Sequence, residues 1–302
     1  MKKLTIIICT YNRSNILKEC ILSLLNNNTD NNYEILVVDN NSTDNTKEII
    51  EQLKLKFSNL KYIFEEKQGL SCARNRGILE STTELVAFID DDVIVEKGYV
   101  KSILEYFIND NNVCAGGKIY TIWHQDKPAW FNDGFFSIIG ETKYGNSNRV
   151  LVNEEYPYGG NMFFRKSIFD KIGVFDEKLG LNGDEIVMGE EVDLCSRIRN
   201  LNYEIYYLNN AVVGHRVHFN KVNKQYIDKR WIEEGKATAQ IINKKDKYYR
   251  LKELIKRLLI LELRDYPFFI ITNLIKSNNK FYWYAKKNRS LALLRNIKIK
   301  GV

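Results

Sequence analysis

Three adjacent carboxylates, Asp90, Asp91 and Asp92, follow directly after the apolar run 85–89. Such a run is typical of a buried strand in a parallel sheet, and ligand sites of open α/β sheets lie just beyond the carboxyl ends of these strands. Neighbouring carboxylates repel one another, so a bound cation would offset their charge. Mg²⁺ and Mn²⁺ prefer carboxylate oxygen and leave coordination positions for phosphate groups. A solvated acidic turn is the alternative, which the strand in front disfavours.

Polar and aromatic residues also follow two other expected strands, over residues 4–10 and 34–39. An aromatic ring and a carboxylate at neighbouring strand ends can bind a nucleobase, the ring by packing and the carboxylate by accepting an N–H. For Asp39 a helix-capping turn is the alternative. The candidates for nucleotide binding at these strand ends are Thr10, Tyr11, Arg13, Asp39, Asn40 and Asp91.

Two further acids, Glu190 and Glu191, begin an expected helix over residues 189–201. A carboxylate within hydrogen-bond reach of a hydroxyl can take its proton while a new bond forms. The dipole at a helix N-terminus favours the ionised carboxylate, which suits a base. Ordinary first-turn helix charge is the alternative.

His215 follows the apolar run 211–214, at another expected strand end. A neutral imidazole can complete a carboxylate metal shell or contact phosphates. A structural histidine is the alternative, with His218 as a weaker metal candidate and His124 expected in a mobile acceptor loop.

The elements that must position these residues alternate through the first third of the chain. This alternation predicts βαβ units and a mainly parallel sheet, so the fold class is α/β. Farther on, strand patterns and then helical patterns continue to the end of the chain. The expected strands are 4–10, 34–39, 60–64, 85–89, 113–122, 204–207 and 211–213, and the later helices are 166–172, 189–201, 251–263 and 267–275.

Two common phosphate-binding motifs are absent from the sequence. The first strand is not followed by Gly-x-Gly-x-x-Gly, which disfavours a dehydrogenase-type dinucleotide fold. There is no Gly-x-x-x-x-Gly-Lys-Ser/Thr either, so a P-loop is excluded.

Several motifs occur together in a fixed order, and as a set they resemble the family 2 glycosyltransferases, which have the GT-A fold. The resemblance covers about residues 3–240. The motifs that carry it are 5–13 (TIIICTYNR), 37–44 (VVDNNSTD), 69–78 (GLSCARNRGI), 88–92 (FIDDD), 160–165 (GNMFFR), 189–197 (GEEVDLCSR) and His215.

The resemblance implies a metal-dependent, inverting transfer of a sugar from a nucleotide-sugar, with UDP as the expected nucleotide. Asp90 and Asp92 match the Asp-x-Asp motif that holds Mg²⁺ or Mn²⁺ on the diphosphate, with His215 as the third expected ligand. Thr10, Tyr11 and Asp39 match the nucleoside-binding positions, and Arg74 matches a contact to the diphosphate or base. Glu191 matches the catalytic base, where the family more often has Asp, and Glu190 is the alternative base.

The expected acceptor is a glycan or a lipid-linked glycan of surface-polysaccharide assembly. Acceptor contacts are expected near Gly160 and Asn161 and in the aromatic middle of the chain, where Trp130 could stack on a sugar ring or belong to a core. One rival is a nucleotidyltransferase acting on sugar phosphates, which would release pyrophosphate. The other is a non-enzyme that binds nucleic acid or membrane through basic residues.

Charge is distributed unevenly along the chain. Residues 216–302 hold 22 Lys and Arg against 7 Asp and Glu, whereas the whole chain has a net charge of +7. A basic tail suggests an anionic partner, which could be a membrane surface, nucleic acid or an acidic substrate. Of these we expect a membrane surface and no nucleic acid. The cluster Lys276, Lys280, Lys286, Lys287 and Arg289 around the aromatic run 281–284 is the expected contact, and a packed or solvated helical tail is the alternative.

The chain is expected to divide into a nucleotide-sugar-binding half over 1–110, an acceptor-binding half over 111–220 and a basic helical extension over 221–302. Its five cysteines are scattered without metal-binding spacing, which predicts reduced thiols in a cytosolic protein. No stretch reaches the roughly 20 apolar residues of a membrane span. The expected location is therefore cytoplasmic, with peripheral attachment to the inner face of the membrane.

Overall fold

The computed structural model describes residues 2–27, 32–153, 155–182, 185–187, 189–218, 221–243 and 246–298. The chain forms two compact units. Unit 1 consists of Met1–Ile122, Gly140–Glu185 and Glu190–Arg216, and unit 2 of Trp123–Ile139, Ile186–Gly189 and Val217–Val302. The expected segments 1–110 and 111–220 thus lie largely in one unit, and the aromatic segment 123–139 groups with the C-terminal helices.

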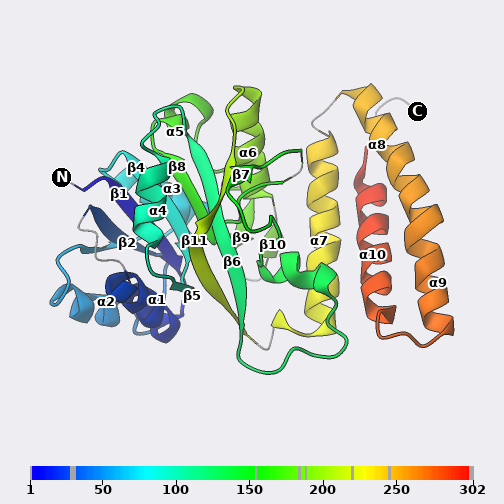
Figure 1. Ribbon diagram of the computed structural model, residues 1–302, viewed down its shortest axis with the longest axis horizontal. Coiled ribbons are helices and arrows are strands. Elements are labelled where there is room, and N and C mark those ends of the chain that lie inside the picture. Colours follow the sequence, from blue (N-terminus) through cyan, green and yellow to red (C-terminus); the bar gives the residue numbers. More distant parts are fainter. Residues whose placement is uncertain are drawn as a thin grey trace. The chain divides into compact units, whose positions relative to one another are not determined.

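Unit 1 is built on one mixed sheet (Figure 1). Among the described residues it has nine strands in the order β3-β2-β1-β4-β8-β6-β11-β5, with β7 paired to β11. The strands are β1 (Leu4–Thr10), β2 (Tyr33–Asp39), β3 (Leu60–Phe64), β4 (Leu85–Asp90), β5 (Val93–Val95), β6 (Cys114–Trp123), β7 (Arg149–Val150), β8 (Asn161–Arg165) and β11 (Tyr206–Val217). Two short strands, β9 (Gly180–Asn182) and β10 (Glu185–Val187), lie outside this sheet.

The first four strands of the sheet order are parallel, as the alternation predicts. Thr10 pairs with Asp39, and Cys9 pairs with Asp90, so the carboxyl ends of β1, β2 and β4 meet at one edge. The sequence does not predict strand β8, which pairs antiparallel with β4 and places Asn161 beside Ile89. It also predicts two short strands where the structure has the single strand β11.

Helices cover both faces of the sheet. On β1, Ile6 and Ile8 belong to the core cluster of one face, whereas Ile7 belongs to that of the other. This alternation buries both faces and gives three layers. Helices α1 (Ser14–Asn27), α2 (Thr46–Lys54) and α4 (Tyr99–Tyr106) pack on the first face, and α3 (Leu70–Glu80), α5 (Ile168–Ile172) and α6 (Glu190–Asn200) pack on the second.

Unit 2 is helical, and its core is aromatic. Helix α10 packs along α7, and the cluster centred on Phe135 and Trp231 includes Trp130, Phe281 and Tyr282. Among the residues that the structure describes, no helix has both the length and the apolar composition needed to cross a bilayer. The elements are η1 (Asp133–Ile139), α7 (Lys224–Asn243), α8 (Lys247–Ile260), the π-helical turn η3 (Leu261–Asp265), α9 (Tyr266–Leu274) and α10 (Lys280–Asn296).

A buried amide ties the middle of the sheet together. The Nδ2 of Asn161 donates to the carbonyl oxygens of Lys118 on β6 and Ala211 on β11, and the hydroxyl of Tyr99 donates to its Oδ1. This bridge passes over Gly117, where a Cβ atom would lie 2.2 Å from the carbonyl oxygen of Ala211 and 2.3 Å from the Asn161 Nδ2.

We therefore expect Gly117→Ala to destabilise the fold by about 1–3 kcal/mol, because the added methyl must displace backbone and a buried amide. The urea midpoint of unfolding measures this loss. Lys118→Ala, on the neighbouring residue of the same strand, is the control and should stay within about 0.5 kcal/mol of wild type. Equal effects of the two changes would contradict the close approach.

Candidate functional site

The acidic run ends strand β4 in a buried turn. Asp91 and Asp92 are buried. The Thr10 hydroxyl donates to Oδ2 of Asp91 at 2.7 Å, and Nη1 of Arg13 lies 2.9 Å from Oδ1 of Asp91 and 3.2 Å from Oδ2 of Asp92. Burial raises the pKa of Asp91 to about 6, against the opposing effect of the Arg13 charge. The turn is therefore not a solvated loop, and Arg13 supplies part of the counter-charge.

His215 lies against the last carboxylate of the run. Strand β11 pairs His215 with Val93, the residue after Asp92. This register brings Nε2 of His215 to 3.2 Å from Oδ1 of Asp92, and the amide of Arg216 donates to the carbonyl oxygen of Asp92. The fold thus joins one imidazole and one carboxylate that lie 123 residues apart in the sequence.

The carboxylate of Asp90 lies beside Gly160, away from the contacts of Asp91 and Asp92. It makes no hydrogen bond or ion pair with the described residues, and a Cβ atom at position 160 would be 2.6 Å from Oδ2 of Asp90. Any larger residue at position 160 would push this carboxylate away. The absence of a side chain at Gly160 therefore lets the Asp90 carboxylate pack closely against this turn.

The side chains near the acidic run could hold a divalent cation only together with other ligands. No group of three or more His, Cys, Asp or Glu side chains within the described part of the chain is placed to hold a metal ion. The expected three-residue set of Asp90, Asp92 and His215 is thus not assembled. The Asp92–His215 pair fits a cation that takes its other ligands from phosphate oxygens and water, as Mg²⁺ sites commonly do.

A second cluster joins helices α3 and α6. Nη1 of Arg74 lies 3.2 Å from Oε1 of Glu190 and 3.8 Å from Oε1 of Glu191. Arg74 is buried, and its guanidinium also lies 5.4 Å from the centroid of the Phe175 ring. The expected contact of Arg74 to a diphosphate or base would require it to leave a buried ion pair, which is costly. In this structure Arg74 holds the two glutamates.

The side chain of Glu191 is more exposed than that of Glu190. Its side chain is 18% exposed against 8% for Glu190, and Gly159 faces its carboxylate, where a Cβ atom would lie 2.3 Å from Oε1. Burial, reinforced by the charge of Glu190, raises the pKa of Glu191 to about 8, although Arg74 opposes the shift. This shift opposes the expected effect of the helix dipole, which favours the ionised carboxylate.

The predicted nucleoside-binding residues divide into exposed and enclosed side chains. Tyr11 is 43% exposed at the end of β1. Asp39 is buried and accepts hydrogen bonds from the Ser42 amide and the Tyr62 hydroxyl, which orient its carboxylate and leave acceptor capacity on both oxygens. The ring and the carboxylate remain candidates for binding a nucleobase.

Asn40 requires a correction. Its Nδ2 donates to the carbonyl oxygens of Glu65 and Lys67, and its Oδ1 accepts from the amide of Gly69. Because both ends of the amide are engaged, Asn40 braces the loop before α3 and does not offer its side chain to a nucleotide. The same argument applies to Asn161, whose amide is fully occupied inside the sheet and cannot be the expected acceptor contact.

Trp130 packs within unit 2. Its ring lies 5.3 Å from that of Phe281 and 5.9 Å from that of Phe131, with Lys224 over its face. The core alternative therefore describes Trp130 better than stacking on a sugar.

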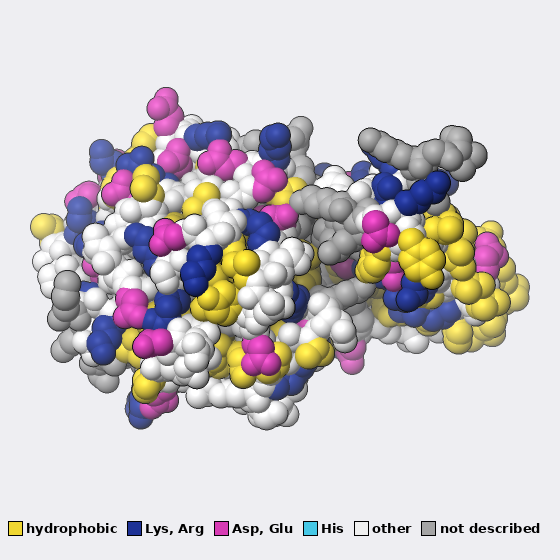
Figure 2. Space-filling view, turned by 90° about the horizontal axis from the view of Figure 1, so that it is seen from above, with side chains coloured by type: hydrophobic (Ala, Val, Ile, Leu, Met, Phe, Trp, Pro, Cys, Tyr) yellow, Lys and Arg dark blue, Asp and Glu magenta, His cyan; other side chains and the backbone are white. Residues whose placement is uncertain are grey.

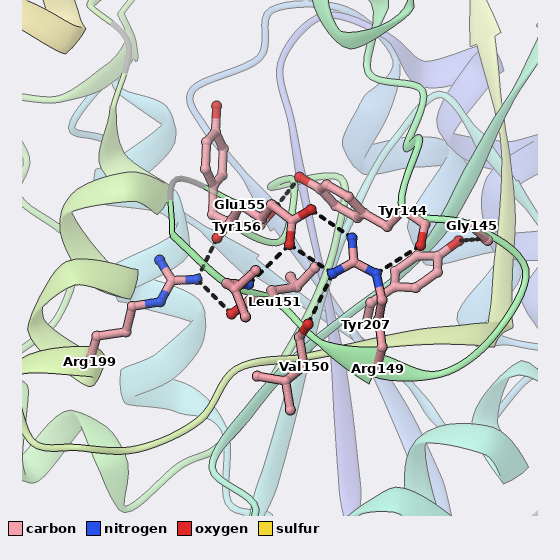
Figure 3. Close-up of polar contacts among 10 residues, drawn as sticks. Tyr144, Gly145, Arg149, Val150, Leu151, Glu155, Tyr156, Arg199 and Tyr207 are labelled. Atoms are coloured by element: carbon pink, nitrogen blue, oxygen red, sulfur yellow. Dashed lines mark hydrogen bonds and ion pairs between the residues drawn. The ribbon is translucent and has the colours of Figure 1, made fainter.

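A polar network that the sequence does not reveal braces the segment before Gly159 (Figure 3). Arg149 forms a two-bonded ion pair with Glu155 at 2.6 and 2.8 Å and also donates to the carbonyl oxygen of Tyr144. From α6, Arg199 donates to the carbonyl oxygens of Leu151 and Glu155. This network ties the segment to the helix that carries Glu190 and Glu191. Arg149 and Glu155 do not lie in one helix or strand, since β7 ends at Val150, so no periodicity reveals their pairing.

Comparison with known proteins shows which family the sequence matches. A model of the family described as glycosyl transferase family 2 matches residues 5–173, more than half of the chain. A glucosyl-dolichyl phosphate glucuronosyltransferase of Haloferax volcanii is 27% identical over 225 residues, which cover 71% of this chain and 69% of that protein.

Two solved structures share the fold. A mannosyltransferase of Pyrobaculum calidifontis, PcManGT, in complex with GDP-Man and Mn²⁺, has a TM-score of 0.57 at 14% identity and covers 98% of this chain and 72% of its own. GalNAc-T7 with UDP, GalNAc and Mn²⁺ has a TM-score of 0.57 at 16% identity. It covers 72% of this chain, which spans only 43% of GalNAc-T7. The expected GT-A fold is confirmed.

The raised pKa of Glu191 predicts a measurable effect on stability. Between pH 4.5 and about 8 the folded protein binds a proton here that the unfolded chain releases, so folding stability falls as pH rises through this window. Glu191→Gln has no such proton to lose. We expect its stability advantage over wild type to grow by roughly 2–4 kcal/mol between pH 5 and pH 9.

Denaturant unfolding of both proteins across this pH range measures the difference. Glu66→Gln changes an exposed carboxylate and should leave the pH profile of wild type unchanged. A parallel profile for Glu191→Gln and wild type would show that Glu191 is ionised in the folded protein at neutral pH.

Proposed function

Because the chain belongs to glycosyl transferase family 2 and is a glycosyltransferase, we propose that it moves a sugar from a nucleoside diphosphate sugar to an acceptor hydroxyl with inversion at the anomeric carbon. One observation carries this proposal. Asp90, at the end of β4, lies beside Gly160, and Glu191, at the start of α6, lies beside Gly159, so the acidic run and the glutamate pair meet at one short turn. This arrangement suits one group that holds a leaving diphosphate and another that activates an acceptor.

The donor half uses the edge of the parallel strands. Tyr11 packs on the nucleobase, and Asp39 accepts an N–H from it. Asp92 and His215 hold Mn²⁺ or Mg²⁺, which when bound stabilises the charge that develops on the diphosphate. The two structural neighbours, one with UDP and one with GDP-Man and each with Mn²⁺, support a nucleotide-sugar and a divalent cation. We propose UDP as the nucleotide.

The acceptor half uses helix α6. The oxygen of the acceptor hydroxyl attacks the anomeric carbon, the bond from that carbon to the diphosphate breaks with its electron pair on the leaving oxygen, and the hydroxyl proton passes to the Glu191 carboxylate. A single displacement inverts the anomeric configuration. A carboxylate with a raised pKa is a stronger base once ionised. The ion pair of Glu190 with Arg74 keeps the guanidinium beside Glu191.

The acceptor and the cellular setting are also proposals. The Haloferax relative is named as acting on a glucosyl-dolichyl phosphate, which supports a lipid-linked glycan as acceptor. We infer a role in surface-polysaccharide assembly at the cytoplasmic face of a membrane. The rival nucleotidyltransferase reaction is distinguished by its product, since it releases pyrophosphate and glycosyl transfer releases a nucleoside diphosphate.

The metal pair gives one prediction. Asp92→Ala should abolish transfer and remove the Mn²⁺-dependent part of donor binding, because it deletes one of the two protein ligands. A thermal-shift screen of UDP-, GDP-, dTDP- and CMP-sugars with and without Mn²⁺ measures binding, since a bound ligand raises the melting temperature. Asp126→Ala, at an exposed position, is the control. Full activity of Asp92→Ala, or of wild type in EDTA, would rule out this metal role.

Glu190 and Glu191 give a second prediction. Glu191→Gln should reduce kcat by roughly 100-fold or more, the usual scale for loss of a general base, while donor binding stays close to that of wild type. Glu190→Gln should reduce kcat less, because it loosens Arg74 without removing the base. Steady-state kinetics with the donor found in the screen test both variants. A larger loss for Glu190→Gln would exchange the two roles.

A further inference from the structure

The continuous helical segment formed by α8, η3 and α9 has an unusual distribution of side chains. Within residues 247–274 the buried side chains are those of Glu253, Leu261, Asp265 and Thr272, three of which are polar. Many large apolar side chains of the same segment are exposed instead. They are Tyr248, Tyr249, Leu251, Ile255, Leu258, Leu259, Leu263, Tyr266, Phe268, Ile270, Ile271 and Leu274.

The buried polar groups are satisfied inside unit 2. Glu253 pairs with Lys256 and Arg257, and Asp265 accepts from the Ser290 hydroxyl at 2.6 Å and from Arg264. A surface helix of a water-soluble protein normally shows the opposite arrangement, with apolar residues inside and polar residues outside. The buried polar groups on the inward face of this segment therefore have their partners within unit 2. The outward face carries apolar side chains and is suited to an apolar surrounding.

Seven of the exposed apolar residues recur at spacings of three or four along the segment. Leu251, Ile255, Leu259 and Leu263 recur every four residues, which places them on the same side of a helix. Tyr266, Ile270 and Leu274 continue the same spacing after η3. Leu259 is 54% exposed and Leu263 is 74% exposed. Single exposed apolar residues are common on protein surfaces, but a contiguous face of this size marks an interaction site.

The charges beside this face are mostly positive. Residues 246–280 hold eight Lys and Arg against four Asp and Glu, and two of those acids, Glu253 and Asp265, are buried and paired. Figure 2 shows hydrophobic side chains gathered with Lys and Arg at the end of the view that Figure 1 assigns to α8 and α9. A second copy of the chain would bring two positive faces together, whereas an anionic lipid surface complements them.

We propose that this outward face of α8, η3 and α9 inserts into the interface of an anionic phospholipid bilayer, with Lys252, Lys276 and Lys280 at the headgroups. Apolar insertion and a basic patch together hold a protein to a membrane more firmly than either one alone. This surface replaces the expected contact through the run 281–284, because Phe281 and Tyr282 pack in the core of unit 2. The proposal goes beyond sugar transfer and does not depend on it.

Co-sedimentation of the full chain with vesicles tests the proposal. Wild type should bind vesicles of phosphatidylcholine mixed with phosphatidylglycerol much more strongly than vesicles of phosphatidylcholine alone. Leu259→Asp and Leu263→Asp should each weaken this binding at least tenfold. The control is Leu55→Asp in unit 1, which changes a leucine that is 88% exposed and should bind like wild type.

The charge component is tested separately. Lys276→Glu combined with Lys280→Glu should weaken binding to the anionic vesicles by roughly fivefold for each residue and reduce its dependence on salt. Circular dichroism and transfer to a water-soluble acceptor analogue should be unchanged in all these variants, since none alters the site of unit 1. Loss of transfer in wild type would count against the proposed function and not against this surface.

Two outcomes would overturn the proposal. One is equal binding of wild type, Leu259→Asp and Leu263→Asp to the vesicles, or no binding by any of them. The other is a dimer, measured by analytical ultracentrifugation, that Leu259→Asp dissociates while vesicles bind none of the proteins. That result would assign the face to a second copy of the chain.

Discussion

The need to balance buried negative charge governs the arrangement of unit 1. Asp91 and Asp92 lie in a buried turn, where desolvation raises the pKa of Asp91. The guanidinium of Arg13, after β1, offsets that cost, and Nε2 of His215, on β11, lies 3.2 Å from Oδ1 of Asp92. Removing one partner of a buried charged pair leaves the other uncompensated, which costs more than the pair contributes. The segment after β1 is therefore held to the end of β4 by the Arg13 ion pairs as well as by the backbone pairing of β1 with β4.

The same constraint acts at Arg74, but there the charge is left incompletely balanced. One guanidinium serves two glutamates, so an extra negative charge remains in a buried position when both are ionised. The raised pKa of Glu191 is the result. Gly159 and Gly160 make room for this charge and for Asp90, because neither contributes a side chain to the turn. The arrangement of the acids in this site therefore depends on the absence of side chains at Gly159 and Gly160.

Local patterns in the sequence predict the part of this site that is local. The parallel strands, the acids after β4 and the glutamates at the start of α6 all follow from runs of apolar residues and their ends. The bond between Arg74 and Glu190 joins residues 116 positions apart, and no periodicity reveals it. Asn40 and Asn161 show a second limit. Their residue type suits both ligand binding and internal bridging, and only the positions of the neighbouring carbonyl groups decide between the two.

Unit 2 sets a different limit on sequence reasoning. Periodicity in residues 247–274 identifies an amphipathic helix but not which face is buried, since Glu253 and Asp265 lie inside only because Arg257, Arg264 and Ser290 meet them there. The family match ends at residue 173, before every helix of this segment. The two proposals rest on different observations. The proposed transfer rests on the buried charges of unit 1, whereas the proposed surface rests on unit 2, which encloses its polar groups and leaves apolar side chains exposed.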